Sequence, residues 1–354
     1  MTTSAAGASL TDFAIRAAER GRLADIFLRA GIRRLVRERL AEIQAGGCEA
    51  IAARRQSFIE EMETSEIALL PQEANRQHYE VPAAFFGEVL GPHRKYSSAW
   101  WGDGISDLAA AEEAALTITA TRAGLEDGMR ILELGCGWGS LTLWMASHYP
   151  NAHITALSNS NSQRLYIEGR AAERGLGNIE IITCDINDFD TDTRFHRVVS
   201  VEMFEHVRNY RRAFEGVRRW LAPKGRFFMH IFCHRDAPYP FVPRSPGDWM
   251  SRHFFSGGIM PSDGLPFSIP GNPLLPIAQW RWSGVHYRRT ADAWLANMDR
   301  SKERIMPIFE SVYGSGQATI WWHRWRIFWM SCAELFGYDA GQQWWVSHYL
   351  FGRD

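Results

Sequence analysis

The sequence lacks the long apolar run of a membrane-spanning helix: no window approaches the roughly 20 apolar residues that a span needs. The N-terminus carries Asp12 and Glu19 and has no apolar stretch of signal-peptide length, so we expect a cytoplasmic protein. Cysteine is scarce as well, with five residues in 354 and no CxxC pair. This scarcity argues against a disulfide framework and a thiolate zinc site, and we expect no bound metal.

An excess of one charge is also missing. Lysines and arginines number 39 against 40 aspartates and glutamates, so the formal net charge is −1. A nearly neutral chain does not attract polyanions over long distances, and nucleic acid is therefore not an expected partner. Arginines outnumber acids between residues 10 and 60, where apolar residues at helical spacing predict two or three amphipathic helices. We favour a solvated helical face there over weak contact with an anionic membrane surface.

Tryptophan is abundant, with fifteen residues in the chain and a concentration from Trp280 onward. Trp325, Trp329 and Phe336 are spaced as on one helix. Such a group either lines a ligand pocket or fills a core, and we expect core packing for these three.

Short apolar runs and helical patterns alternate from residue 130 onward. The apolar runs are MRILEL, HITALS, IEIITC, FHRVVSV and RFFMHIF. This alternation predicts an α/β fold in which a parallel sheet is covered on both faces. A helix at about 105–124 precedes the alternation. A strand (QWRWSGVHY), two helices at about 290–311 and 318–336 and a final strand (WWVSHYLF) follow it.

The expected organisation is an N-terminal helical extension, residues 1–104, that contributes to the active site, followed by a catalytic core over residues 105–354. Residues 235–275 interrupt the core with many prolines and glycines and are too long for a simple connection. We expect this segment, with residues 290–336, to form a lid or pocket wall.

A glycine loop, ELGCGWG, separates the first of these strands from a helix and contains Glu133, Gly135, Gly137 and Gly139. Dinucleotide binding is the competing interpretation, but the third glycine falls one residue too early for GxGxxG. An acidic residue two positions before the first glycine resembles the first motif of class I methyltransferases. The resemblance implies a doubly wound, mostly parallel, seven-stranded Rossmann-like sheet and S-adenosyl-L-methionine as cofactor, bound through Glu133, Gly135 and Gly137.

Polar residues follow the next two strands. Asp185, after the third strand, is expected to face the adenine amino group of the cofactor, and Ile186 the adenine ring. The second strand ends without the usual ribose-binding acid, so Ser158, Asn159 and Gln163 are the candidates for the ribose. The alternative is that Asn159 and Ser160 are only turn and N-cap residues.

The motif VEMFEHVRNYRRAF lies where the fourth strand ends, at the sheet edge that binds ligands in open α/β sheets. Together with QHYEVPAAFF, KYSSAWW, HIFCHR, DWMSRHFFSGGIMPS and FGYDAGQQWWVSHYLF, it resembles the cyclopropane-fatty-acyl-phospholipid synthase-like superfamily. Within that group the chain is most similar to alkaloid N-methyltransferases of the coclaurine and pavine type and their bacterial relatives. The resemblance covers about residues 70–354.

This resemblance assigns roles to particular residues. It implies that Glu202, Glu205 and His206 form the catalytic cluster, with Tyr79 and Glu80 facing it. It also implies that Tyr96 and Ser97 help to bind the methyl donor.

The spacing of the cluster agrees, because a helical turn would place these three side chains on one face. The alternative is that Glu205 and His206 cap the helix that follows the fourth strand. Zinc is not favoured at this motif, which offers a single histidine, and HIFCH is better explained as the end of the fifth strand.

One departure from the family pattern bears on the reaction. Cyclopropane synthases have a cysteine in a YSC motif, thought to help hold a bicarbonate base, whereas this chain has Ser98 at that place. Because Ser98 weakens the bicarbonate mechanism, we expect side chains to supply the base. Ala99 in turn replaces a neighbouring cysteine of the alkaloid enzymes.

The predicted reaction is methyl transfer to an amine nitrogen of a small cyclic or aromatic-bearing molecule. Glu80, Glu202 and Glu205 would attract the ammonium, and His206 would accept its proton directly or through water. Neighbouring carboxylates are expected to raise the pKa of His206 from about 6.5. The alternative is methylation or cyclopropanation of unsaturated acyl chains of lipids. The identity of the acceptor and assembly into a homodimer are left open by the sequence.

Overall fold

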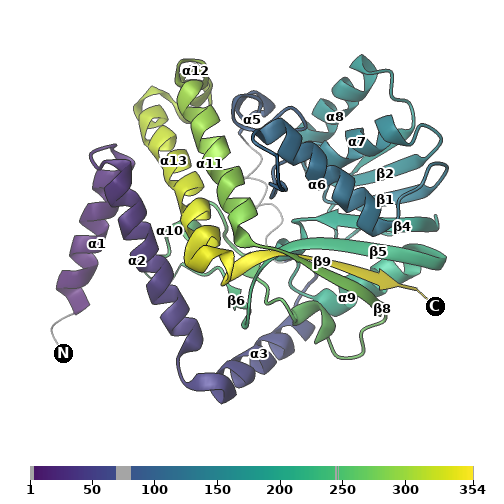
Figure 1. Ribbon diagram of the computed structural model, residues 1–354, viewed down its shortest axis with the longest axis horizontal. Helices are drawn as coiled ribbons and strands as arrows, with labels where there is room; N and C mark the ends of the chain where they lie inside the picture. Colours follow the sequence, from purple (N-terminus) through teal and green to yellow (C-terminus); the bar gives the residue numbers. More distant parts are fainter. Residues whose placement is uncertain (1–3, 69–80, 244, 246, 354) are drawn as a thin grey trace.

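A computed structural model describes residues 4–68, 81–243, 245 and 247–353. Its centre is a seven-stranded sheet with the order β3-β2-β1-β4-β5-β9-β8 (Figure 1). The strands are β1 Arg130–Leu134, β2 His153–Ser158, β3 Ile179–Thr183, β4 Phe195–Val201, β5 Leu221–His234, β8 Leu275–Trp282 and β9 Trp344–Gly352. The first five run parallel, and β9 is antiparallel to both of its neighbours. The predicted doubly wound, mostly parallel, seven-stranded sheet is confirmed.

Helices cover both faces of the sheet because its central strands are apolar on both sides. The covering helices are α6 Leu108–Ala123, α7 Ser140–His148, α8 Asn161–Glu173 and α9 Tyr210–Trp220. One core contains Leu116, Met145 and Val199, and another contains Phe214 and Phe227. These layers fix the carboxyl ends of β1 to β4 at one edge of the sheet.

A second group of helices stands beside the sheet (Figure 1). It comprises α1 Ser4–Glu19, α2 Asp25–Gln44, α3 Gly47–Glu63, α5 Ala83–Val89, α10 Trp249–His253, α11 Gly284–Arg300, α12 Lys302–Tyr313 and α13 Ser315–Gly337. The N-terminal helices agree with the sequence pattern. The helix expected at about 290–311 is instead divided at Ser301, which ends α11 and precedes α12.

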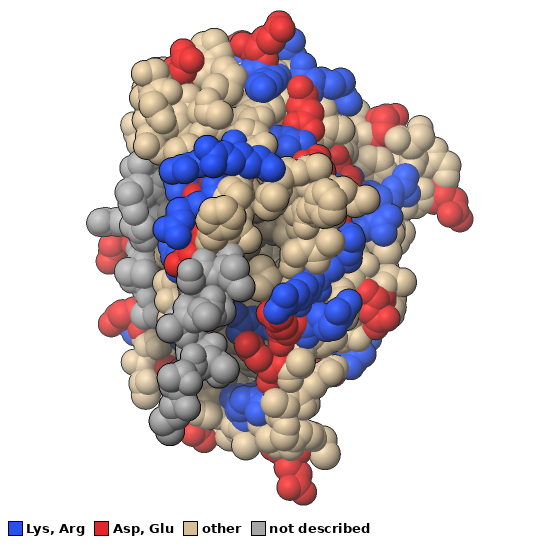
Figure 2. Space-filling view, turned by 90° about the vertical axis from the view of Figure 1, so that its left-hand side faces the viewer, with Lys and Arg blue, Asp and Glu red and all other residues tan. Residues whose placement is uncertain are grey.

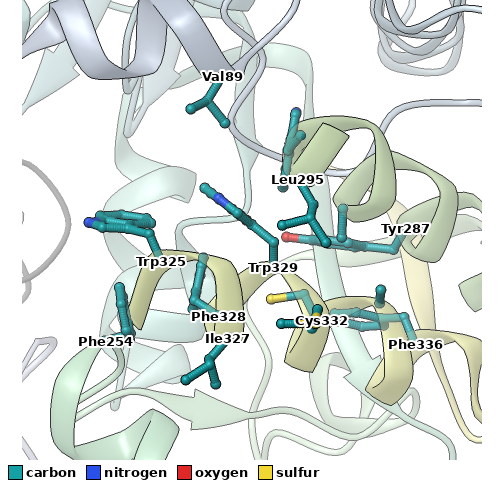
Figure 3. Close-up of a cluster of buried hydrophobic side chains, with 14 of the residues drawn as sticks. Val89, Phe254, Tyr287, Leu295, Trp325, Ile327, Phe328, Trp329, Cys332 and Phe336 are labelled. Atoms are coloured by element: carbon teal, nitrogen blue, oxygen red, sulfur yellow. The ribbon is translucent and has the colours of Figure 1, made fainter. Parts of the chain in front are cut away.

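Aromatic side chains fill the space among these helices (Figure 3). Trp325 and Trp329 are fully buried with ring centroids 5.3 Å apart, and Phe336 stacks on Tyr287 at 4.1 Å. Phe254 of the neighbouring loop stacks on Phe328 at 4.4 Å. The expected core packing of Trp325, Trp329 and Phe336 is confirmed.

The proline-rich segment 235–275 contains α10, the short strands β6 Tyr239–Pro240 and β7 Ile259–Met260, and the 3-10 turn η2 Leu265–Phe267. Asp263 anchors it to the sheet edge, because its carboxylate accepts hydrogen bonds from Arg281 of β8 and from Trp345 and Ser347 of β9. No helix in the described ranges has the length and apolarity required to cross a membrane.

Candidate active site

A cleft opens at the edge where β1, β2, β3 and β4 end. Its volume is about 810 Å³ with the open mouth included. Both the glycine loop and the motif after β4 contribute to it. The lining residues are Ala68, Gly135, Gly137, Leu157, Ser158, Asn159, Gln163, Cys184, Asp185, Ile186, Glu202, Met203, His206, Val207, Ser256 and Gly257. The structure thus brings together most residues predicted to bind the methyl donor and two of those predicted to be catalytic.

The glycine loop is tied to the adjacent strand, because the N–H groups of Gly135 and Cys136 both donate to the carbonyl of Leu157. Gly135 has a φ of +78°, and a Cβ atom there would lie 2.6 Å from Cγ of Met203. Only glycine fits this position. Glu133 does not line the cleft: it is buried behind the loop and accepts a hydrogen bond from Thr142, and burial raises its pKa to about 7.

The far end of the cleft is suited to a nucleoside. Ser158 Oγ donates to Gln163 Oε1 at 2.7 Å, while Gln163 Nε2 is buried and has no hydrogen-bond partner within the described part of the chain. Asp185 Oδ1 accepts from both nitrogens of Asn187, which leaves Oδ2 for a ligand. A buried unpaired donor suits a ribose hydroxyl, and apolar walls from Leu157 and Ile186 suit a purine ring.

The turn between β2 and α8 contains an N-cap residue and a residue of the cleft wall. Ser160 caps α8, because its Oγ accepts from the N–H of Gln163 at 3.4 Å. Asn159 lines the cleft.

Glu202, Glu205 and His206 are brought together in a different way from the one expected. The helical turn is wrong: Glu202 has a left-handed backbone with φ +48°, and only Phe204–His206 forms a 3-10 turn, η1. The capping alternative is wrong as well, because the N-cap of α9 is Asn209, whose side chain accepts from the N–H of Arg212.

The Glu202 carboxylate is held on both oxygens. Oε1 accepts from the N–H of Ser98 at 2.9 Å and lies 3.1 Å from Nε2 of His230, and Oε2 accepts from the Tyr287 hydroxyl at 2.8 Å. Burial raises the pKa of Glu202 to about 7, although the nearby Lys95 ammonium and the bonds from Ser98 and Tyr287 oppose the rise. Glu202 therefore changes its charge near neutral pH.

Glu205 lies behind the cleft lining. Its Oε1 accepts from the N–H of Phe232 at 2.7 Å, and its buried Oε2 has no partner among the described residues. Burial and the like charge of Glu202 raise its pKa well above the ordinary value. The physical consequence is that Glu205 resists ionisation more strongly than Glu202 beside it.

His206 lines the cleft, but its pKa moves opposite to our expectation. Burial lowers it to about 4, so the predicted rise caused by neighbouring carboxylates is wrong. The reason is that the imidazole itself is buried, and burial disfavours its charged form. His206 is thus a neutral imidazole at pH 7.

Three residues of this site were missed by sequence reasoning: Lys95, His230 and Tyr287. Lys95 is buried, donates to Ser97 Oγ and the Ser98 carbonyl, and has a pKa lowered by burial to about 8. The three residues come from separate parts of the chain, and no local sequence motif indicates that they lie close together in the fold. His230 could have been suspected from HIFCH, which does end β5 as expected.

Tyr96 and Ser97, like Glu133 and Glu205, do not line the cleft. Tyr96 packs against Phe86 with ring centroids 5.0 Å apart, and Ser97 is buried beside Lys95. Tyr79 and Glu80 lie outside the described residues. Across the described ranges, no group of three or more histidine, cysteine or acidic side chains is arranged to hold a metal ion.

Comparison with known proteins agrees with this geometry. Residues 70–343 match the family model for mycolic acid cyclopropane synthetase. (S)-coclaurine N-methyltransferase of Thalictrum flavum subsp. glaucum is 32% identical over 330 residues, 91% of each chain. Cyclopropane-fatty-acyl-phospholipid synthase of Escherichia coli (strain K12) is 32% identical over 222 residues, 62% of this chain and 54% of that enzyme.

A solved structure extends the likeness to the whole chain. Coclaurine N-methyltransferase, in a crystal structure bound to N-methylheliamine and S-adenosylhomocysteine, has a TM-score of 0.93 and 30% identity, covering 99% of this chain and 100% of that one. The fold, the cleft and the extent of these matches show that the chain belongs to the mycolic acid cyclopropane synthetase family of S-adenosylmethionine-dependent methyltransferases.

Proposed function

We propose that the chain transfers a methyl group from S-adenosyl-L-methionine to an amine nitrogen of a small cyclic or aromatic-bearing molecule. The observation that carries this proposal is the shared cleft: Glu202 and His206 line the same cavity as the glycine loop. The extensive similarity to coclaurine N-methyltransferase supports an amine acceptor.

The residues that would hold the methyl donor fit its three parts. Gly135 and Gly137, with Glu133 behind them, would face its amino-acid end; Ser158, Asn159 and Gln163 would face the ribose; Asp185 and Ile186 would face the adenine. All of them except Glu133 line the cleft. S-adenosylmethionine supplies a methyl group already activated by a sulfonium. The protein therefore has to align the acceptor and free its lone pair.

Freeing the lone pair requires removal of a proton. An alkylamine with a pKa near 10 is only about one part in a thousand free base at pH 7, a cost of ~4 kcal/mol. Glu202, with a pKa of about 7, is the better proton acceptor, whereas His206, with a pKa of about 4, offers a neutral nitrogen that accepts a hydrogen bond from the ammonium. Burial and the charge of Glu202 raise the pKa of Glu205, which disfavours a second negative charge in the cluster.

The N-terminal extension, residues 1–104, belongs to this site in our proposal. Ala68 lines the cleft, and the backbone of Ser98 holds Glu202. We further propose that the core over residues 105–354 carries its lid in residues 235–275 and 290–336. Ser256 and Gly257 support this, because both line the cleft.

Lipid modification is the second candidate function, supported by the similarity to the Escherichia coli synthase. The arginine-rich helices give it less support than their composition suggests. Figure 2 shows many basic side chains on that side of the molecule, with acidic ones among them. On α2, Arg29 and Arg33 pair with Glu334, and Arg34 pairs with Glu38.

A cytoplasmic location and a homodimer stay predictions.

The test is transfer of labelled methyl from S-adenosylmethionine to a panel of secondary and tertiary cyclic amines and, in parallel, to unsaturated phospholipid vesicles. We expect label on amines, with turnover lowered at least a hundredfold by Glu202→Gln. Exposed His153→Ala, at the opposite end of β2, is the control and should keep full activity. Label confined to the vesicles would reject the amine proposal in favour of the lipid one.

A further inference from the structure

Two histidines lie side by side behind Glu202. His230 of β5 and His348 of β9 are directly paired across the antiparallel ladder, fully buried, with ring centroids 4.6 Å apart. Nε2 of His230 lies 3.1 Å from Glu202, and Nδ1 of His348 lies 3.0 Å from the guanidinium of Arg122 on α6. The two imidazoles thus lie between the cleft carboxylate and a partly exposed cation.

The chemistry of the two ends fixes where the protons sit. Arginine only donates, so His348 Nδ1 must accept, and the single proton of this neutral ring is on Nε2. An ionised Glu202 only accepts, so the proton of His230 is on Nε2 and its Nδ1 carries a lone pair. Neither His348 Nε2 nor His230 Nδ1 has a protein partner within the described part of the chain. A buried donor and a buried acceptor therefore remain on neighbouring rings.

We propose that Arg122, His348 and His230 form one polarised hydrogen-bonded chain that fixes His230 in the tautomer that donates to Glu202. A single water that accepts from His348 Nε2 and donates to His230 Nδ1 would join the two rings. Arg122, His348 and His230 are positioning residues: they act on the amine only through Glu202. The inference rests on the proposed function, in which Glu202 accepts the proton.

The surroundings suit such a chain. Around Glu202 the other charged or titratable groups are Lys95, Glu205, Tyr287 and Cys332. Around the histidines they are Lys95 and Arg122, and burial with these cations lowers both histidine pKa values well below the ordinary one. Neutral rings are what a chain with one proton per imidazole requires. Arg122 is held in place by the rings of Trp280 and Trp282, at 5.1 and 5.8 Å.

The tautomers are measured by nitrogen NMR of protein labelled with ¹⁵N-histidine, with the two signals assigned from His230→Gln and His348→Gln. We expect both rings to carry their proton on Nε2 at neutral pH. In Arg122→Met, His348 should no longer be confined to the tautomer that is protonated on Nε2. A proton on Nδ1 of His230 in the wild-type protein would overturn the proposal.

Kinetics of the full-length protein give the second readout. Arg122→Met weakens the bond that stabilises ionised Glu202, so the acidic limb of kcat should move up by about half a pH unit, a roughly twofold loss at pH 7, with KM for S-adenosylmethionine unchanged. Arg197→Met is the matched control: Arg197 is also half-buried, but among the described residues its guanidinium donates only to the carbonyls of Ala123, Gly124 and His196. A pH profile of kcat that is the same for Arg122→Met and Arg197→Met would reject the proposed hydrogen-bonded chain. Full turnover in Glu202→Gln would reject the proposed base, while the nitrogen signals still report the tautomers.

Discussion

At the scale of single residues, the charge of Glu202 governs the proposed reaction. Its pKa of about 7 lies between the ordinary carboxyl value and that of an amine. A base must be ionised to act, so kcat should rise with pH through about 7 and then level off. A pH profile of single-turnover rates measures this. A profile flat from pH 6 to 8 would show that another group takes the proton.

Gly135 allows a second prediction at this scale. Gly135→Ala places a Cβ atom 2.6 Å from Met203 at a left-handed φ, so the loop must shift and methyl-donor affinity should fall at least tenfold, by about 1.4 kcal/mol or more. Titration calorimetry with S-adenosylmethionine measures it. Gly128→Ala is the control, because Gly128 has the same φ of +78° and open space around it. Equal affinities in the two variants would contradict the expected role of the loop.

At the scale of elements, the sequence predicts the sheet well because its strands are buried apolar runs and its turns contain glycines or polar residues. Apolar runs such as ILEL and FHRVVSV leave little choice between strand and helix when glycines or polar turns bound them. The division at Ser301 was missed because no glycine stands there and the apolar pattern continues across it.

The site was predicted where one motif carries it and missed where several elements converge. The glycine loop and the Glu202 motif are contiguous in sequence and lie at strand ends. Tyr287 reaches Glu202 from α11, 85 positions later, and only the packing of that helix against the sheet brings the two together. The pKa of His206 was misjudged because the burial of its own imidazole cannot be read from the residue types around it.

Asp263 yields a prediction about the segment 235–275. Asp263→Ala removes the acceptor for Arg281, Ser347 and Trp345 and should lower the free energy of unfolding by about 2 kcal/mol. Denaturant titration measures it. The surface pair Arg235–Asp236 provides a control, since Asp236→Ala should cost less than about 0.5 kcal/mol.

The pH dependence of this contribution has a definite sign. Burial alone would raise the pKa of Asp263, but the hydrogen bonds from Arg281, Ser347 and Trp345 outweigh burial and lower it. The stabilisation is therefore complete above pH 3.8, the ordinary value, and disappears as the pH falls through the lowered pKa. The difference between wild type and Asp263→Ala should shrink only in that acidic range.

At the scale of the whole molecule, ion pairs join the N-terminal helices to the C-terminal ones. Arg326 of α13 bonds both oxygens of Asp25 at the start of α2 and both oxygens of Asp299 on α11. Arg326→Met should therefore lower the melting temperature measurably, with a smaller difference at high salt. Methyl-donor affinity should not change, because none of these residues lines the cleft. Arg34→Met, which breaks a pair within one helix, should have almost no effect on melting.

The aromatic cluster of Figure 3 also gives the molecule an optical property. The ring centroids of Trp294 and Trp329 lie 5.1 Å apart, and those of Trp329 and Trp325 lie 5.3 Å apart. Excitation energy absorbed by one ring therefore passes readily to the next. Emission then comes from whichever ring lies lowest in energy, wherever the light was absorbed. A change in the environment of that ring therefore alters the fluorescence of the whole cluster. Intrinsic tryptophan fluorescence would thus detect the opening of this core without an added dye.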